Sequence, residues 1–133
     1  KAWLTTAATL LLLVQLVTAL WMYGRLPGRS AAPPWASMLH RWSGASAFVL
    51  TLPVMFHCVW SLGFATDTTR TLVHSIAGCA LYGAFAAKML ALRLRGLPGW
   101  LLPLLGGLVM ACLLTLSFGA ALWYFTRDGV PLR

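Results

Sequence analysis

Three histidines, His40, His57 and His74, lie inside apolar stretches of the sequence. Ionisable side chains are costly within a membrane, and those that occur there usually serve a function. The chain has only two acidic residues, Asp67 and Asp128, and neither falls inside an apolar stretch. Because imidazole is a common axial ligand of haem, the iron of a haem held between helices is the partner that these side chains favour.

The spacing of the histidines predicts which two share one iron. His57 lies about one turn before the end of an apolar stretch over 35–62, and His74 lies about one turn after the start of the next, over 72–92. In antiparallel neighbours both imidazoles reach the same depth, near the outward surface, so one bis-histidine haem b would bridge them. His40 lies 17 positions before His57, which is about 26 Å along a helix. It therefore cannot ligate the same iron.

The pattern His-x-x-x-Gly occurs twice, at positions 40–44 and 74–78, and an aromatic residue, Phe48 or Tyr82, follows four positions later. Residues four apart share a helix face, so each glycine is expected to leave a gap beside its histidine into which a flat macrocycle would fit. The glycines alone favour ordinary close contact between membrane helices. Because no acidic residue falls inside the apolar stretches to pair with the three histidines, haem binding is favoured over simple helix packing.

Four other residues have roles that follow from their positions. Arg70 lies beside the expected haem and is suited to pair with a propionate, although snorkelling to the headgroups explains it equally well. Pro53 lies one turn before His57 and should kink its helix. Gln15, in the middle of the first apolar stretch, is expected to donate an interhelical hydrogen bond. Lys88 is expected to snorkel to the cytoplasmic surface.

The elements that must position these residues are membrane-spanning helices. The 133 residues are 60% hydrophobic and 9% charged, whereas a soluble domain carries about 25% charged residues. Four segments, approximately 2–23, 35–62, 72–92 and 101–125, have the roughly 20 apolar residues that a bilayer requires. The short connections between them predict a single all-α integral membrane domain over 1–133, a four-helix up-and-down bundle. All seven tryptophans fall near segment ends, as expected at headgroup level.

The formal charge of +8 is an orientation signal. The basic residues flank apolar segments and form no stripe, which excludes a nucleic-acid-binding surface. The bases assigned to one side of the membrane are Arg25, Arg29, Arg41, Lys88, Arg93 and Arg95. The positive-inside rule then predicts cytoplasmic first and third connections and outward termini, most naturally in a bacterial inner membrane. Because the chain starts with Lys1, a preceding segment or processing is expected.

The histidine-bearing stretches resemble the transmembrane helices of cytochrome b-561-like and ferric-reductase-like proteins. Positions 39–48 read Leu-His-Arg-Trp-Ser-Gly-Ala-Ser-Ala-Phe, and positions 74–78 read His-Ser-Ile-Ala-Gly. The resemblance covers roughly 36–95 and implies non-covalent b haem bound by paired histidines, one haem in each leaflet, with electrons moving within or across the membrane. The sequence departs from this pattern at Ala91, where a fourth histidine would complete a two-haem arrangement. His40 would then need a methionine, Met22, Met38 or Met89, or a partner subunit.

Two functions remain open. The first is a b-type haem electron carrier with one haem at His57 and His74, where Arg70 and Gly78 complete the site, or less favourably with a second haem at His40. Such a carrier would be a subunit of a larger redox complex, with membrane or outward-facing redox partners or a quinone; no nicotinamide or flavin motif suggests catalysis on its own. The alternative is a haem-free structural or assembly subunit, whose small residues favour close helix contact. A transporter or channel is disfavoured because intramembrane acids are absent.

Overall fold

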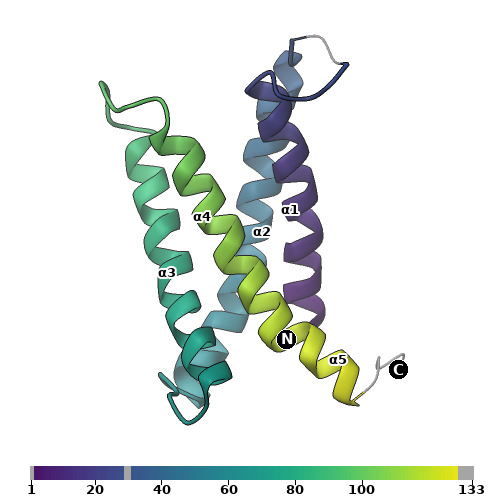
Figure 1. The fold of residues 1–133 in the computed structure, drawn as a ribbon, viewed down its shortest axis with the longest axis vertical. Helices are drawn as coiled ribbons and strands as arrows, with labels where there is room; N and C mark the ends of the chain where they lie inside the picture. The colour runs from purple at the N-terminus through teal and green to yellow at the C-terminus, as the bar shows by residue number, and fades with distance from the viewer. Residues whose placement is uncertain (1, 29–30, 129–133) are drawn as a thin grey trace. The chain divides into compact units, whose positions relative to one another are not determined.

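The computed structural model describes residues 2–28 and 31–128, and this part of the chain is helical with no strand (Figure 1). Four spans in it are long and apolar enough to cross a membrane. The fourth consists of three consecutive helical segments that form one rod. The elements are α1 (Ala2–Met22), α2 (Pro34–Ser61), α3 (Thr69–Ala91), α4 (Leu101–Leu116), a π-helical segment η1 (Ser117–Leu122) and α5 (Trp123–Asp128). The expected all-α class with four membrane spans is confirmed.

The chain forms two compact units, Lys1–His57 and Cys58–Arg133. The first unit is an antiparallel hairpin of α1 and α2. At the connecting end of the hairpin, the rings of Trp21 and Trp35 meet edge to face with their centroids 5.4 Å apart. Farther along, small and polar side chains fill the interface. The buried residues are Ala8, Leu12 and Thr18 from α1 and Ala36, Ser43, Ala47 and Thr51 from α2.

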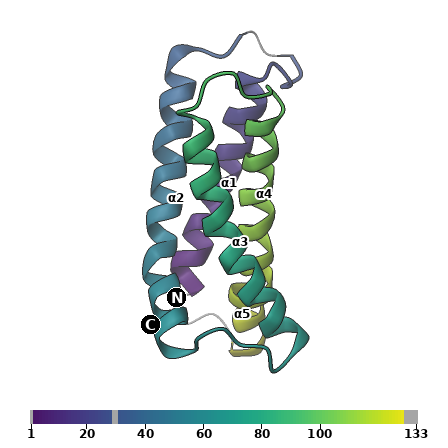
Figure 2. The same ribbon diagram turned by 90° about the vertical axis from the view of Figure 1, so that its left-hand side faces the viewer.

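In the second unit, α3 packs antiparallel to the rod formed by α4, η1 and α5 (Figure 2). Its buried residues are again mostly small, which lets the helix backbones approach closely. They are Ala77, Leu81, Ala84 and Ala91 on α3, Cys112 and Leu113 on α4, and Ser117 and Ala121 on η1. At the far end of α3, the Nζ atom of Lys88 lies 3.8 Å from the position that a Cβ on Gly106 would take. This amine therefore packs against α4, a contact that the expectation of snorkelling did not include.

Helix α3 begins at Thr69, three residues before the sequence-based estimate. The reason is a capping box. The backbone N–H of Thr71 donates to Thr68 Oγ1 at 3.2 Å, and the backbone N–H of Thr68 donates to Thr71 Oγ1 at 3.0 Å. Two backbone donors that the helix itself leaves unpaired are thus satisfied. The cap adds a polar first turn to α3, and Arg70 lies in this turn.

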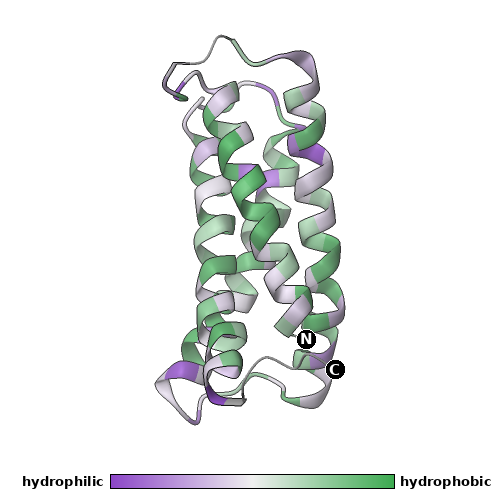
Figure 3. Ribbon diagram, turned by 90° about the vertical axis from the view of Figure 1, so that its right-hand side faces the viewer, coloured by the Kyte–Doolittle hydropathy of each residue, from purple (hydrophilic) through white to green (hydrophobic). Residues whose placement is uncertain are grey.

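The exposed surface of the helices is apolar, and hydrophilic positions gather mainly at the helix ends and loops (Figure 3). Large hydrophobic side chains point outwards in the middle of every span, for example Leu10, Val49, Ile76 and Leu108, which are 45–60% exposed. Such a surface would be unfavourable in water, but it matches the hydrocarbon interior of a bilayer. Together with the four spans, it identifies the chain as a membrane protein. Arg29, one of the bases in the orientation argument, lies outside the described residues, as do Lys1 and Arg133.

Candidate cofactor pocket beside His74

A hollow of about 410 Å³ lies in the second unit, between the first two turns of α3 and the opposite rod. Known ligand pockets occupy about 300–1,000 Å³. Two of the residues selected from the sequence, Arg70 and His74, line this hollow together. They are four positions apart on α3 and therefore share one face of the helix. The full lining is Thr69, Arg70, Val73, His74, Thr115, Phe118 and Gly119.

The opposite wall of the pocket is shaped by the π-helical segment η1. Phe118 and Gly119 belong to this segment, and both line the pocket. The hydroxyl of Ser117 donates to the carbonyl of Leu113 at 2.8 Å, which ties the start of the segment to α4. Single π-helical turns inside α-helices are rare and occur frequently at functional sites. In the described part of the chain, no atom lies within 4 Å of where a Cβ on Gly119 would be, so the wall is open at this point.

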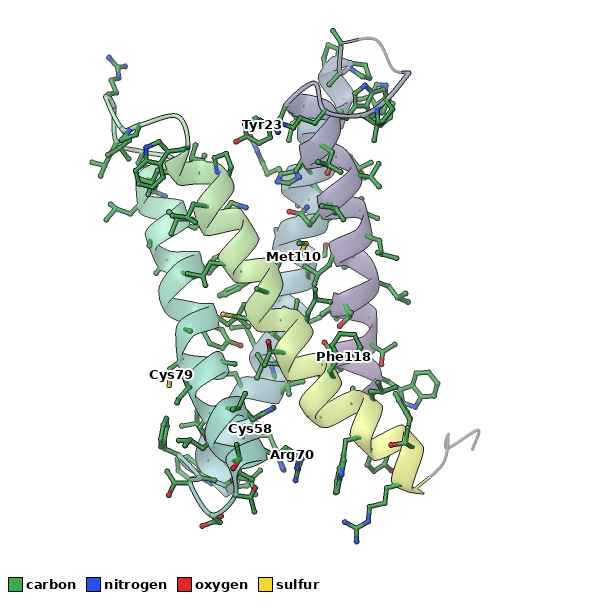
Figure 4. All side chains as sticks on the ribbon, in the orientation of Figure 1. Tyr23, Cys58, Arg70, Cys79, Met110 and Phe118 are labelled. Carbon is green, nitrogen blue, oxygen red and sulfur yellow. The ribbon has the colours of Figure 1, made fainter. Side chains whose placement is uncertain are left out.

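Arg70 connects α3 to the rod at the rim of the pocket. Its Nη1 donates to the carbonyl of Gly119 at 3.1 Å, and its Cζ lies 4.2 Å from the ring centroid of Trp123. Figure 4 shows the side chain reaching from the start of α3 towards the α4–α5 rod. The guanidinium thus has an acceptor from η1 and an aromatic face from α5, and it is held where the pocket opens.

The two His-x-x-x-Gly patterns have different surroundings. Around Gly78, four positions after His74, no described atom outside its own stretch of helix lies within 4 Å of an added Cβ, so this face of the helix is open. Gly78 is not among the residues that line the pocket. The same expectation is wrong at Gly44. There the side chain of Gln15 fills the space, with Oε1 only 3.0 Å from the Cβ position. The first pattern is therefore a helix-packing contact, whereas the second has an open face at its glycine.

His40 lies in a polar cluster between α1 and α2. Gln15 Nε2 donates to the backbone carbonyl of His40 and to Ser43 Oγ, the latter at 2.7 Å, which confirms the interhelical hydrogen bond expected of Gln15. Thr18 Oγ1 lies 2.8 Å from His40 Nδ1 and 2.6 Å from the carbonyl of Val14. His40 is half-buried, and its Nδ1 atom is within hydrogen-bonding distance of Thr18. When Thr18 gives its single proton to Val14, Nδ1 is the donating nitrogen of the ring.

His57 is half-buried and lies on α2, four residues before the helix ends at Ser61. It belongs to the first compact unit, and His74 belongs to the second. The pairing of their imidazoles on one iron stays a prediction. Pro53 lies inside α2, which is helical on both sides of it.

A family model matches residues 1–132. The chain belongs to DUF6529. This is a family of unknown function. No curated protein and no solved structure matches the chain. Membership of DUF6529 assigns no activity, so a function for this chain must be argued from its own residues.

Within residues 2–28 and 31–128 of this DUF6529 chain, no three His, Cys, Asp or Glu side chains gather into a group that could hold a bare metal ion. Haem needs only one or two protein ligands, because the macrocycle supplies the others. The cysteines Cys58, Cys79 and Cys112 are free thiols. The nitrogen-bearing side chains of the pocket that could contact a cofactor are the imidazole of His74 and the guanidinium of Arg70.

Sequence reasoning missed the half of the pocket that the DUF6529 chain builds from its fourth span. Thr115, Phe118 and Gly119 were not selected as site residues from the sequence. The available signal was the run Ser-Phe-Gly at 117–119, where a serine and a glycine interrupt an otherwise leucine-rich helix. A run of this kind marks a weak point in a helix, but it does not specify a π turn.

Proposed function

We propose that this protein is a membrane b-type haem electron carrier in which His57 and His74 ligate one haem near the outward surface. The observation that carries the proposal is the pocket in the second unit, which combines the His74 imidazole with Arg70 and an apolar wall. Gly78, four positions after His74 on α3, has open space at its Cβ position. The pocket and this space are the features that a flat, largely apolar macrocycle with acidic substituents requires.

Each residue of the pocket has a definite task in this proposal. The imidazole of His74, together with that of His57, would hold the iron. Phe118 and Val73 would contribute apolar lining, and Arg70 would offer its guanidinium to a carboxylate. When bound, haem iron supplies reversible one-electron chemistry. The protein would tune the reduction potential through burial and through the positive charge of Arg70.

The partners proposed for such a carrier are other redox proteins. The sequence has no nicotinamide or flavin motif, so electrons would come from and go to membrane or outward-facing redox subunits, or a quinone. We therefore propose that the protein works as a subunit of a larger redox complex and not as a catalyst on its own. A bacterial inner membrane, with the first and third connections cytoplasmic, fits the distribution of basic residues.

A second candidate, a haem-free structural or assembly subunit, is favoured by the first unit. There the His-x-x-x-Gly pattern at 40–44 serves helix packing, because Gln15 occupies the space beside Gly44. If the second copy of the pattern had the same purpose, its open space would receive a side chain from a partner subunit.

A dithionite-reduced minus oxidised spectrum of the purified full chain distinguishes the two candidates. The haem carrier shows b-type bands in the wild-type protein, loses them in His57→Ala and in His74→Ala, and keeps them in the matched control His40→Ala. If the wild-type protein shows no haem bands, the haem proposal fails and the structural subunit is favoured. Loss of the bands in His40→Ala alone would overturn the ligand assignment.

A further inference from the structure

Trp123 has two guanidinium groups over its ring. Arg70 Cζ lies 4.2 Å from the ring centroid, and Arg127 Cζ lies 5.1 Å from it. Arg70 comes from the first turn of α3, while Arg127 lies one helical turn after Trp123 on α5. We call these three residues the Arg–Trp–Arg cluster. Each contact has the geometry of a cation–π interaction, and together they bring two positive charges from opposite helices to one indole.

The acidic residues nearest in sequence are Asp67, three positions before Arg70, and Asp128, directly after Arg127. The hydrogen bond that the structure gives Arg70 goes to a backbone carbonyl, that of Gly119, and not to a carboxylate. Like charges held close together repel each other, so the cluster is stabilised by any ligand that brings anionic groups to it. Guanidiniums are especially suited to carboxylates and phosphates because their donors match both oxygens.

The cluster also has a fixed relation to the pocket. Arg70 belongs to both, since it lines the hollow together with His74. Trp123 and Arg127 do not line the hollow themselves; they lie on α5, which follows the η1 wall along the chain, and the Trp123 ring contacts both Arg127 and Arg70. A haem is amphipathic in the same sense: the macrocycle is apolar, and its two propionate carboxylates project from one edge.

We propose that the Arg–Trp–Arg cluster is the carboxylate-binding end of the pocket, in which Arg70 and Arg127 hold the two propionates of a haem ligated by His74. Trp123 keeps the two guanidiniums at the rim in the absence of the carboxylates. This inference rests on the proposed haem function and adds Arg127 and Trp123 to its binding residues. It also assigns the orientation of the cofactor, with the carboxylates towards α5.

The test compares two forms of the cofactor on the purified full chain after haem extraction. Haem and its dimethyl ester share the macrocycle, but the ester has no carboxylates. Absorbance titration gives a dissociation constant for each. We expect wild-type protein to prefer haem, and Arg70→Gln and Arg127→Gln each to lower that preference about 3- to 10-fold, in the range for exposed charge pairs. Ester affinity should stay within about twofold of wild type, because the macrocycle contacts are unchanged.

Two further variants sharpen the result. Arg127→Lys keeps the charge and should retain part of the preference. Arg93→Gln removes a guanidinium beyond the opposite end of α3 and should leave the preference unchanged. Because Arg127 is exposed, its replacement should not disturb folding, and circular dichroism of each variant checks this.

Three outcomes would overturn the inference. If Arg127→Gln keeps the wild-type preference for haem over the ester, the propionates are held elsewhere, although the haem function stands. If neither form binds wild-type protein, the haem function and the inference fail together. If the cluster instead binds the phosphate of a lipid, Arg127→Gln would lower the retention of phosphatidylglycerol in mixed nanodiscs and leave the haem-to-ester ratio unchanged.

Discussion

The side-chain amide of Gln15 lies against Gly44, with its Oε1 atom 3.0 Å and its Nε2 atom 3.2 Å from the position of an added Cβ. The glycine permits α1 to bring an amide up to the backbone of α2, where Nε2 donates to the carbonyl of His40 and to Ser43 Oγ. A small residue and a polar residue on opposite helices thus form one interlocking contact. Close approach of this kind stabilises helix pairs in lipid, where hydrophobic burial contributes little.

Gly44→Ala should therefore destabilise the first unit. The new methyl group would meet the Gln15 amide at 3.0–3.2 Å, so the amide must move and its hydrogen bonds weaken, at a cost of about 1–3 kcal/mol. Unfolding in mixed detergent micelles, followed by circular dichroism, measures the change. The matched control is Gly83→Ala on α3, where no described atom lies within 4 Å of the added Cβ. Equal unfolding midpoints for Gly44→Ala and wild type would contradict the interlocking contact.

Gln15→Leu tests the same contact from the other helix. It keeps the approximate volume and removes the donor to His40 and Ser43, so we expect a loss of about 0.5–2 kcal/mol, the range for hydrogen bonds between membrane helices. The double variant with Gly44→Ala should be less destabilised than the two single changes added together, because the hydrogen bonds that Gly44→Ala weakens are already absent in Gln15→Leu. Strict additivity in the same unfolding assay would show that the residues act independently.

Gly78→Leu distinguishes a cofactor space from a packing contact in the second unit. The leucine enters the space beside His74 where no described atom lies within 4 Å of the Cβ, so the apoprotein should be as stable as wild type or slightly more stable. Haem affinity should fall about 5- to 150-fold, which corresponds to the 1–3 kcal/mol cost of overfilling a packed site. Gly83→Leu is the control. Unchanged haem affinity in Gly78→Leu would exclude this face of α3 from the site.

Thr68→Ala tests the capping box that begins α3. The substitution removes the Oγ1 acceptor for the Thr71 backbone N–H, and loss of such a cap costs about 0.5–2 kcal/mol. Faster amide hydrogen exchange at residues 69–72 should report a fraying first turn, and the Arg70 contact to Trp123 should weaken with it. Thr66→Ala, in the preceding loop, should leave exchange in this turn at the wild-type rate. Unchanged exchange in both variants would argue against the cap.

The four spans were predictable from the sequence because a bilayer imposes a minimum length and forbids charge, and both constraints are visible in composition. Gln15 was predictable for the same reason, since an amide in hydrocarbon must find a partner. The early start of α3 was missed because its capping box uses Thr71 at the position where Glu or Gln is usual.

The contrast between Gly44 and Gly78 was not predictable from the sequence. A glycine in a helical pattern tells only that its own helix leaves a space, and whether that space is filled depends on a residue of the neighbouring helix, here Gln15. The wall formed by Phe118 and Gly119 was missed for a related reason. A π turn is a property of how a helix accommodates its packing partner, so leucine-rich periodicity alone cannot locate it.

The π turn at η1 also sets the rotational phase of α5. One extra residue in a helical turn rotates everything after it by about 100°, given 3.6 residues per turn. One extra residue in the π turn therefore rotates α5 so that the face with Trp123 and Arg127 is directed towards Arg70. Deleting Ala120 would remove the extra residue and restore a regular α-helix. The indole of Trp123 would then turn away from Arg70, while α4 keeps its register against α3.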